Sequence, residues 1–310
     1  MPVQGFAVGG EWGGAVLLVA EHGDRERRGF WASWPQAGVP AGNLLAAGVL
    51  AILAATLSDA DFMAWGWRIP FLLSVVLVAI GWWIRNRVSE SRTFATALAE
   101  TEAPPKMPAL DVVRERPVEL VTGAGLRVGE NISYYIITTF SIFWMTKVAG
   151  MSSSQALNAI LIGGAVHFAA IPLFARLSDR VGRRPVYALG GFGLAGFSFL
   201  FFDMLGSGEL GLAAAGITIA LVLHGAMYGP QAAFIVELFP TRYRYSGASI
   251  AYQLTSIVAG SLAPFIAVWL YEEYKSWLPV AIYVGVACLI SGVTALLARE
   301  TRGVDLASIR

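Results

Sequence analysis

The apolar run of residues 119–145 contains polar side chains at helical spacing. These side chains belong to Arg127, Glu130, Asn131, Tyr134, Thr138 and Ser141. At about 100° per residue they fall within roughly 60° of Arg127, which predicts one polar stripe along a helix. A charge at the centre of a membrane helix costs about 2.5–3.5 kcal/mol, so such a stripe indicates a cavity or a polar partner.

Two members of this stripe are charged and could carry transport chemistry. The Arg127 guanidinium is permanently charged and can bind a carboxylate at two points. A glutamate such as Glu130 can take up and release a proton. We therefore expect Arg127, Asn131 and Tyr134 to contact a substrate and Glu130 to couple transport to protons. Two alternatives are an ion pair between Arg127 and Glu130, which are neighbours at i,i+3, and a position of Arg127 near the cytoplasmic mouth.

Further polar residues lie in other apolar runs. Glu11, within a glycine-rich segment, is either a second proton site or a hydrogen-bonding group for a neighbouring helix. His224, Tyr228 and Gln231 share a helix face at i, i+4 and i+7, where His224 could titrate near neutral pH and the other two could contact substrate. The alternative for His224 is a hydrogen-bonded packing role, and packing is the expectation for His167.

The composition excludes most soluble classes of protein. Of 310 residues, 56% are apolar and only 14% are charged, against about 25% charged in soluble domains. The mean hydropathy is +0.62, which predicts an all-α integral membrane protein and no nucleic-acid partner. One cysteine excludes a disulfide scaffold, and catalytic, phosphate-binding and metal-binding motifs are absent, so we expect no enzyme activity, cofactor or metal.

Nine apolar runs are candidate spans, of which the third, fifth and sixth are short against the about 20 residues that a spanning helix needs. They cover residues 3–20, 30–57, 69–84, 119–145, 156–174, 186–202, 210–236, 247–271 and 278–297. Of 22 Lys and Arg, 18 fall in alternate connections or at the C-terminus, so that side and the C-terminus are expected to be cytoplasmic, in a multi-pass inner-membrane protein. The first span would then run inward from outside, which implies an odd number of spans before it.

An internal repeat relates the two ends of the chain. A shift of about 216 residues places Glu21 on Glu237 and Arg28 on Arg244, and Gln36 then falls one residue from Gln253. The two glutamines are repeat mates and candidate substrate contacts. The simplest interpretation is a six-plus-six transporter that lacks its first three helices. The expected parts are a partial N-terminal bundle (1–84), a cytosolic connector (85–116), a C-terminal six-helix bundle (117–302) and a cytosolic tail (303–310).

Specific motifs resemble a known family. Residues 175–185, ARLSDRVGRRP, resemble the loop signature of the major facilitator superfamily, although Ala175 replaces its first glycine. The segments GFAVGGEWGGA (5–15), ELFPTRYRYSG (237–247) and ETRG (300–303) resemble its metabolite:proton symporter branch. The resemblance covers essentially the whole chain. That branch includes permeases for shikimate, 2-oxoglutarate, citrate, and proline or betaine.

The resemblance implies a monomeric secondary transporter that moves a small carboxylate or zwitterion together with protons across the lipid bilayer by alternating access. It also implies gating by residues at cytoplasmic span ends, rather than a role limited to orientation charges and surface ion pairs. These residues are Asp179, Gly182, Arg183, Glu237, Arg244, Glu21 and Arg28. The alternatives are a sugar or drug facilitator of the same superfamily and a truncated product that does not transport.

Overall fold

A computed structural model of the chain describes the backbone of residues 2–87 and 108–309, and their side chains except those of 2–11, 59, 85, 108 and 307. Within these residues every regular element is a helix, which confirms the predicted all-α class. The α-helices are α1 (Pro2–His22), α2 (Arg28–Thr56), α3 (Asp59–Ala64), α4 (Ile69–Arg87), α6 (Pro108–Glu115), α7 (Pro117–Tyr135), α8 (Ser141–Phe143), α9 (Ser153–Val181), α10 (Arg183–Gly206), α11 (Leu210–Val236), α12 (Thr241–Thr255), α13 (Ala263–Tyr274) and α14 (Leu278–Leu297). The π-helical turns are η3 (Ile136–Phe140), η4 (Trp144–Val148) and η5 (Ser256–Gly260), and the 3-10 turns are η1 (Arg25–Arg27), η2 (Gly66–Arg68) and η6 (Leu306–Ser308).

The predicted spans correspond to these helices. Seven helical stretches in the described part of the chain are long and apolar enough to cross a membrane. The other two predicted runs are also helical, as α1 and as the continuous series from α7 to η4. Most of the predicted connector, residues 88–107, lies outside the described residues, and its end forms α6.

The loop expected at residues 175–185 is corrected by the structure. Helix α9 continues to Val181 and α10 begins at Arg183, so Gly182 alone separates them. Its φ of 111° lies in a region that glycine adopts without steric cost. The apolar pattern ends before the helix does, because the last turns of α9 carry two exposed arginines, Arg176 and Arg180, and the hydrogen-bonded Asp179.

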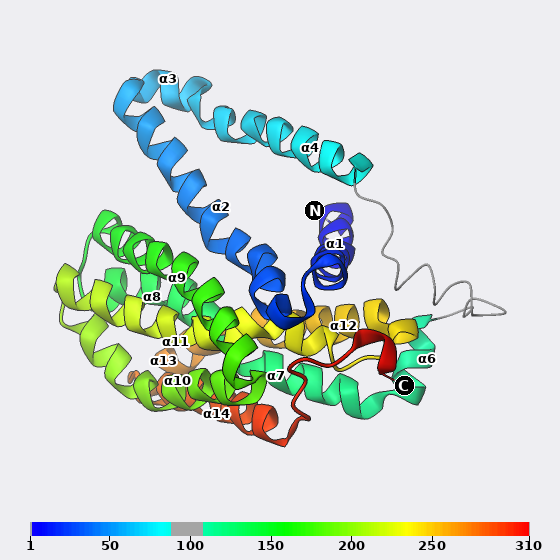
Figure 1. Cartoon of the computed structure of the whole chain (residues 1–310). Coiled ribbons are helices and arrows are strands. Elements are labelled where there is room, and N and C mark those ends of the chain that lie inside the picture. The colour runs from blue at the N-terminus through cyan, green and yellow to red at the C-terminus, as the bar shows by residue number, and fades with distance from the viewer. Residues whose placement is uncertain (1, 88–107, 310) are drawn as a thin grey trace.

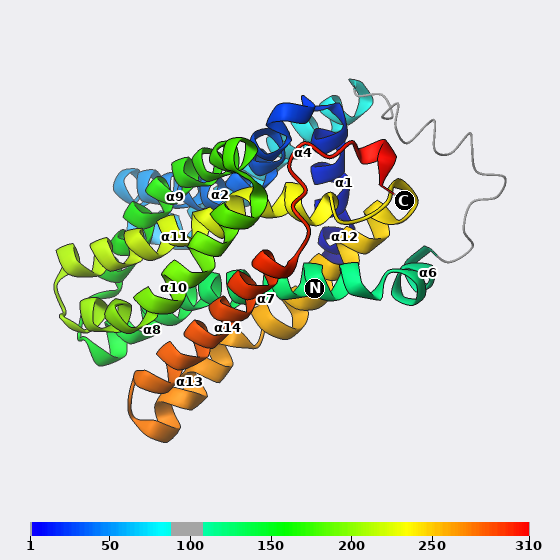
Figure 2. The ribbon, with the colours of Figure 1, turned by 60° about the horizontal axis from the view of Figure 1, so that its bottom comes forward.

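The long helices pack into one bundle, with α11 at its centre (Figure 1). Helix α11 contacts α9, α10 and α2, and α14 contacts α10 and α7. Figure 2 shows α9, α10, α11 and α14 running side by side. Helices α2 and α4 extend beyond the bundle, and α4 carries exposed apolar side chains such as Phe71 and Trp82. Such a surface is suited to lipid or to neighbouring helices.

Glycines let the central helices approach closely. A Cβ on Gly129 of α7 would lie 2.7 Å from the Cα of Cys288 in α14. The same contact includes a hydrogen bond from the Gly129 amide to Ser291 Oγ, at 2.8 Å. Close approach of helix backbones is the usual function of small residues in membrane bundles. The α7–α14 contact fixes the helix that carries the polar stripe.

We expect Gly129→Ala to lower the melting temperature of the detergent-solubilised protein. The added methyl group would meet backbone atoms that cannot move without shifting a helix, and such overpacking costs about 1–3 kcal/mol. Gly196→Ala in α10 is the matched control, since a Cβ there meets nothing within 4 Å. Equal melting temperatures for the two variants would contradict the close approach of α7 and α14.

Candidate functional site

The first half of the polar stripe lies in the interior of the bundle. Arg127 is 4% exposed and Glu130 is 2% exposed. One guanidinium nitrogen, Arg127 Nη1, donates to Glu130 Oε2 at 2.5 Å and to Gln231 Oε1 at 2.9 Å. The ion pair that the sequence left as an alternative therefore forms, and α11 contributes a third polar group.

The opposite edge of the Arg127 guanidinium contacts α12 and the π-helical turn η5. Arg127 Nη2 donates to Ser256 Oγ at 3.1 Å, and Nε lies 3.3 Å from the carbonyl oxygen of Tyr252. The guanidinium carbon lies 3.2 Å from the centre of the Tyr252 ring, a cation–π contact. The charge is held by ligands from α7, α11, α12 and η5, which satisfies the requirement for a polar partner.

Glu130 is the centre of a hydrogen-bonded group. Its Oε1 lies 3.1 Å from His224 Nε2, and its Oε2 accepts from Gln231 Nε2 at 3.1 Å. Gln231 Nε2 also donates to Tyr187 Oη at 2.9 Å, and that hydroxyl donates to the carbonyl of Leu126. Both oxygens of this acid therefore have partners, so a change of its protonation state would rearrange the entire group.

A pair of histidines adjoins this acid. His224 Nδ1 lies 3.0 Å from His167 Nε2, which joins α11 to α9. The rings of Tyr134 and Tyr228 lie 5.3 and 5.2 Å from the His224 ring, centre to centre. His167 has no polar companion on its own helix face in the sequence, and the structure supplies one from another helix.

The remaining four candidate residues lie on four different helices. Gln36 is buried in α2 and accepts from Trp12 Nε1 at 2.8 Å, while Trp12 stacks on Tyr252 at 3.6 Å. Asn131 is buried next to η5, and Gln253 is half-buried. Within the described residues, Gln36 Nε2 and Asn131 Oδ1 are buried without a hydrogen-bond partner. The side chain of Glu11 lies outside the described residues.

The polar stripe changes character where α7 becomes π-helical. From Ile136 to Phe140 the helix widens, and Ser141 Oγ donates to the carbonyl of Ile136, five residues earlier. A π-turn rotates the following residues away from their α-helical projection. Thr138 remains near the site because it lines a cavity with Tyr134.

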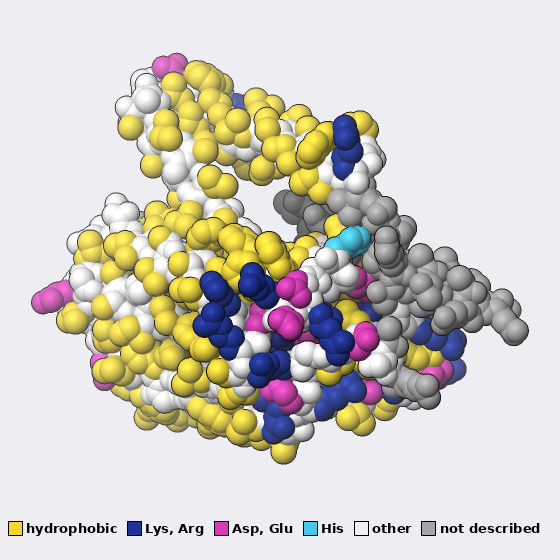
Figure 3. Space-filling model, viewed as in Figure 1, with side chains coloured by type: hydrophobic (Ala, Val, Ile, Leu, Met, Phe, Trp, Pro, Cys, Tyr) yellow, Lys and Arg dark blue, Asp and Glu magenta, His cyan; other side chains and the backbone are white. Residues whose placement is uncertain are grey.

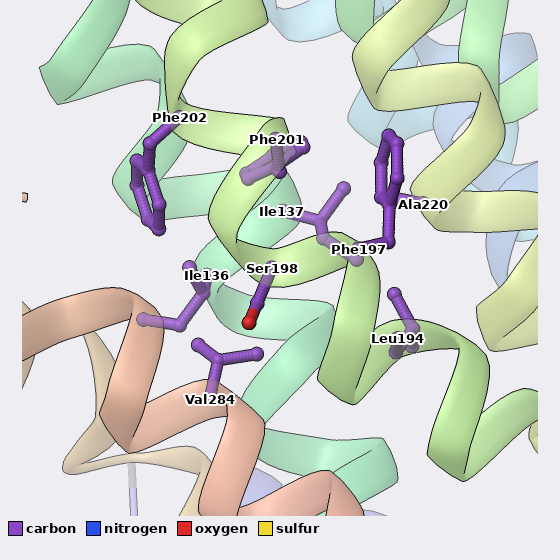
Figure 4. Close-up of a pocket in the computed structure, with 9 residues that line it drawn as sticks. All are labelled: Ile136, Ile137, Leu194, Phe197, Ser198, Phe201, Phe202, Ala220 and Val284. Carbon is purple, nitrogen blue, oxygen red and sulfur yellow. The ribbon is translucent and has the colours of Figure 1, made fainter. Parts of the chain in front are cut away.

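Two small cavities lie near the site. One of about 30 Å³ is lined by residues of α2, α7, η3, α9 and α11, and they are Pro40, Asn43, Leu44, Tyr134, Thr138, Ile160, Leu161, Gly164, His167 and Leu221. The other, of about 10 Å³, is apolar and lies between η3, α10, α11 and α14 (Figure 4). Its one polar side chain, Ser198, donates to the carbonyl of Ala195, so it has no group to orient a polar ligand. Of these two cavities, only the first adjoins the hydrogen-bonded group around Arg127 and Glu130, which includes His167, His224 and Gln231 and is called here the polar cluster.

Charged residues gather at one end of the bundle, called here the charged end. Figure 3 shows basic and acidic side chains around the C-terminal tail on a face that is otherwise mostly hydrophobic. Arg28 Nη1 lies 3.0 Å from Glu237 Oε1, and Arg244 Nη1 lies 3.2 Å from Glu21 Oε1. The repeat mates thus exchange partners, since each acid pairs with the arginine of the other repeat.

The signature segment, which spans the end of α9 and the start of α10, joins the same network. Arg183 bonds Asp179 at 2.6 Å and Glu237 at 3.3 Å. Asp179 also accepts from the backbone amides of Gly29 and Phe30, at 2.9 and 2.8 Å. These two amides belong to the first turn of α2, so Asp179 satisfies the donors that a helix start leaves free.

The C-terminal tail lies across the charged end. Thr301 Oγ1 donates to Glu237 Oε2 at 2.6 Å. Carbonyl oxygens of the tail accept from three arginines, with Arg25 bonding Gly303, Arg28 bonding Val304 and Arg244 bonding Leu306. Two of these arginines come from the N-terminal part of the chain, so the tail connects it to the C-terminal bundle.

Sequence reasoning missed several members of the polar cluster. Tyr187, Tyr252 and Ser256 have no charged neighbour at helical spacing in their own apolar runs, so each becomes conspicuous only when helices pack. Two of the three histidines lie in predicted spans, which was the available signal for His167. No group of three metal-ligating side chains converges in the described part of the chain.

Comparison with known proteins places these observations in a family. The model of the Major Facilitator Superfamily matches residues 3–260 and, in a second match, residues 128–308. The chain is 37% identical over 303 residues to the shikimate transporter of Escherichia coli K12, covering 97% of this chain and 69% of that one. It is 32% identical over 309 residues to the proline/betaine transporter of the same organism, covering 96% of this chain and 61% of the relative.

A solved structure has the same fold. The proton:xylose symporter XylE bound to 6-bromo-6-deoxy-D-glucose superposes with a TM-score of 0.71 at 18% identity, over 94% of this chain and 69% of that one. At this level of identity the likeness concerns the fold alone.

Proposed function

This chain belongs to the Major Facilitator Superfamily, a family of transporters and not of enzymes, and we propose that it carries out proton-coupled symport of a small carboxylate or zwitterion. The relatives named for shikimate and for proline and betaine support this substrate class. All three named compounds carry a carboxylate. The chain spans 61% of the length of the proline/betaine transporter. The activity proposed is therefore that of a full-length symporter of this kind.

The buried guanidinium of Arg127 is the observation that carries the proposal. A permanent positive charge 4% exposed within the bundle favours a substrate with a negative group. In the structure Glu130 supplies the negative charge, at 2.5 Å. A neutral sugar would leave the guanidinium with this partner and would make no use of its charge.

Coupling between proton and substrate can arise if the substrate carboxylate replaces Glu130 as the partner of Arg127. Protonation of Glu130 removes the charge that Arg127 neutralises, and the guanidinium can then bind the substrate carboxylate. Loading a proton together with a substrate carboxylate keeps one negative group beside Arg127, whether or not the substrate also carries an ammonium group. Loading either one alone leaves a buried unpaired charge, which is costly, so proton and substrate move together.

Other side chains of the cluster complete the proposed substrate site. Asn131 Oδ1 and Gln36 Nε2 are buried and have no hydrogen-bond partner among the described residues, so they can bond a hydroxyl, an ammonium or a second carboxylate oxygen. The proposed substrate contacts are Arg127, Asn131, Tyr134, Tyr228, Gln231, Gln36 and Gln253. The proposed proton sites are Glu130, Glu11 and His224.

The charged end is proposed to be the cytoplasmic gate in its closed state. Two ion pairs, Glu21–Arg244 and Arg28–Glu237, join the N-terminal part of the chain to the C-terminal bundle. Asp179, itself bonded by Arg183, holds the first turn of α2 against α9. Gly182 is the proposed pivot between α9 and α10, which it alone separates. These contacts separate when the two parts rock apart, which opens the site to the cytoplasm.

The proposed setting is the inner membrane, with the C-terminus in the cytoplasm. The positive-inside distribution of Lys and Arg supports this orientation. In this arrangement residues 1–84 and 117–302 form the two parts that move, residues 85–116 connect them, and residues 303–310 are the tail. The site needs no second copy of the chain, and a monomer is the proposed unit.

The test is transport by the purified chain in liposomes with an imposed pH gradient. We expect labelled shikimate or proline to accumulate in the lumen when the outside is acidic, and a protonophore to prevent it. With one proton per molecule, a gradient of one pH unit supports about tenfold accumulation. Uptake of xylose without uptake of either carboxylate would favour a sugar facilitator. Uptake of none of them by correctly inserted protein would contradict transport by this chain.

A further inference from the structure

We propose that His167 is the entry point of a proton relay, His167–His224–Glu130, which connects the cavity of about 30 Å³ to the buried acid. The inference rests on the proposed coupling role of Glu130. It assigns a function to the one buried histidine that the coupling mechanism above does not use.

The cavity provides the starting point of the relay. His167 lines it together with the polar side chains of Asn43, Tyr134 and Thr138. A space of this volume holds at least one water molecule when polar groups are present to bond it. His167 lies in the middle of α9, with 14 residues of the helix on either side. Water in the cavity would therefore bring a proton to the interior of the bundle.

The nitrogens of the two histidines form a continuous path from there to the acid. His167 Nε2 lies 3.0 Å from His224 Nδ1, and His224 Nε2 lies 3.1 Å from Glu130 Oε1. His224 therefore has one nitrogen next to His167 and the other next to Glu130. His167 has Nε2 next to His224, which leaves its Nδ1 to bond water in the cavity. Both gaps are within the reach of direct proton transfer.

The transfer steps conserve protons and charge. A hydronium ion in the cavity gives its proton to His167 Nδ1 and leaves a neutral water, and the proton on Nε2 of that ring moves to His224 Nδ1. The proton on His224 Nε2 then moves to Glu130 Oε1. One proton has entered and one carboxylate has become a carboxylic acid, while both imidazoles end neutral in their other tautomers. Return of the proton along the path restores the first tautomers.

The surroundings restrict the relay to one proton at a time. The rings next to the two imidazoles are those of Tyr134 from α7 and Tyr228 from α11, and Asn43 from α2 lines the cavity together with His167. Arg127 holds the second oxygen of Glu130. Two imidazolium ions with nitrogens 3.0 Å apart in a buried site would repel each other. The relay therefore carries one proton at a time, and Glu130 is the one carboxylate at its end that can receive it.

The experiment is a rapid pH jump followed by infrared absorption of the purified, full chain. The carbonyl stretch of a protonated carboxylic acid reports the arrival of the proton, and Glu130→Gln identifies the band of Glu130. We expect His167→Gln to slow the rise of this band about 10²-fold with the same final amplitude. The Gln amide can keep the contact with His224 but cannot carry a proton.

The controls separate a relay from a structural role. His22 is exposed and lies within hydrogen-bond distance of the carbonyl of Leu18, far along the sequence from the relay. The carboxylic acid band should therefore rise at the wild-type rate in His22→Gln. His167→Asn is the second variant, and the melting temperatures of both are measured alongside. A wild-type rate in the His167 variants overturns the relay alone. The absence of a Glu130 band in the wild-type protein from acid to alkaline pH overturns both the relay and the coupling site.

Discussion

Glu130→Gln is expected to abolish accumulation of substrate against its gradient while leaving exchange of labelled for unlabelled substrate intact. The Gln side chain imitates the protonated acid, so Arg127 stays available to the substrate carboxylate. With no proton to load or release, the pH gradient no longer drives uptake. The measurement is uptake of labelled shikimate into liposomes, first with an imposed pH gradient and then with equal pH and unlabelled shikimate inside.

The size of the effect follows from the coupling itself. A gradient of one pH unit, which supports about tenfold accumulation with one proton per molecule, should give no accumulation in the variant. Glu119→Gln is the matched control, because Glu119 lies in the first turn of the same helix and pairs with Arg116 near the surface. Uphill uptake by Glu130→Gln with an unchanged pH dependence would exclude this acid as the coupling site.

The stripe of α7 shows how far helical spacing alone can lead. Arg127, Glu130, Asn131 and Tyr134 lie within eight residues of regular α-helix, so their common face could be predicted from periodicity. Ser141 comes after the π-turn, where the periodicity changes. No pattern in the sequence specified that turn. Its position depends on packing between η3 and the helices around it.

The charged end shows a different limit of the sequence. The repeat placed Glu21 on Glu237 and Arg28 on Arg244, but similarity between two segments does not say whether each acid pairs within its own repeat. The pairs cross between repeats because the two segments lie against each other at the charged end, so each acid meets the arginine of the other repeat. Position and residue type were predictable, whereas the partners required the fold.

The polar cluster shows a third limit, which concerns residues without a pattern. Within their predicted spans, His167 and Tyr187 have no polar residue three, four or seven positions away, and a polar residue without such a neighbour in an apolar run usually packs. Each bonds a group on another helix, and His167 bonds His224 at 3.0 Å. Contacts between helices depend on how the helices rotate and cross, which is a property of the whole bundle.

Glu237→Ala is expected to be the most destabilising single change at the charged end. The carboxylate is fully buried and bonds Arg28, Arg183 and the hydroxyl of Thr301. Its removal leaves two buried guanidinium groups short of a counter-charge, and breaking such a pair costs about 3–5 kcal/mol. The measurement is the free energy of unfolding in detergent by denaturant titration.

A double-mutant cycle with Arg28→Ala then separates the pairwise contact from the general cost of cutting side chains. We expect the double variant to be less destabilised than the sum of the singles, because the second change removes a charge that the first left unpaired. Glu272→Ala is the control, since its pair with Lys275 is exposed to solvent and exposed pairs contribute about 0–1 kcal/mol. Equal losses in Glu237→Ala and Glu272→Ala would contradict the buried network. A large loss of unfolding free energy with strictly additive single changes would show that Glu237 stabilises the charged end through Arg183 and Thr301. Its pair with Arg28 would then add little to the contact between the N-terminal part of the chain and the C-terminal bundle.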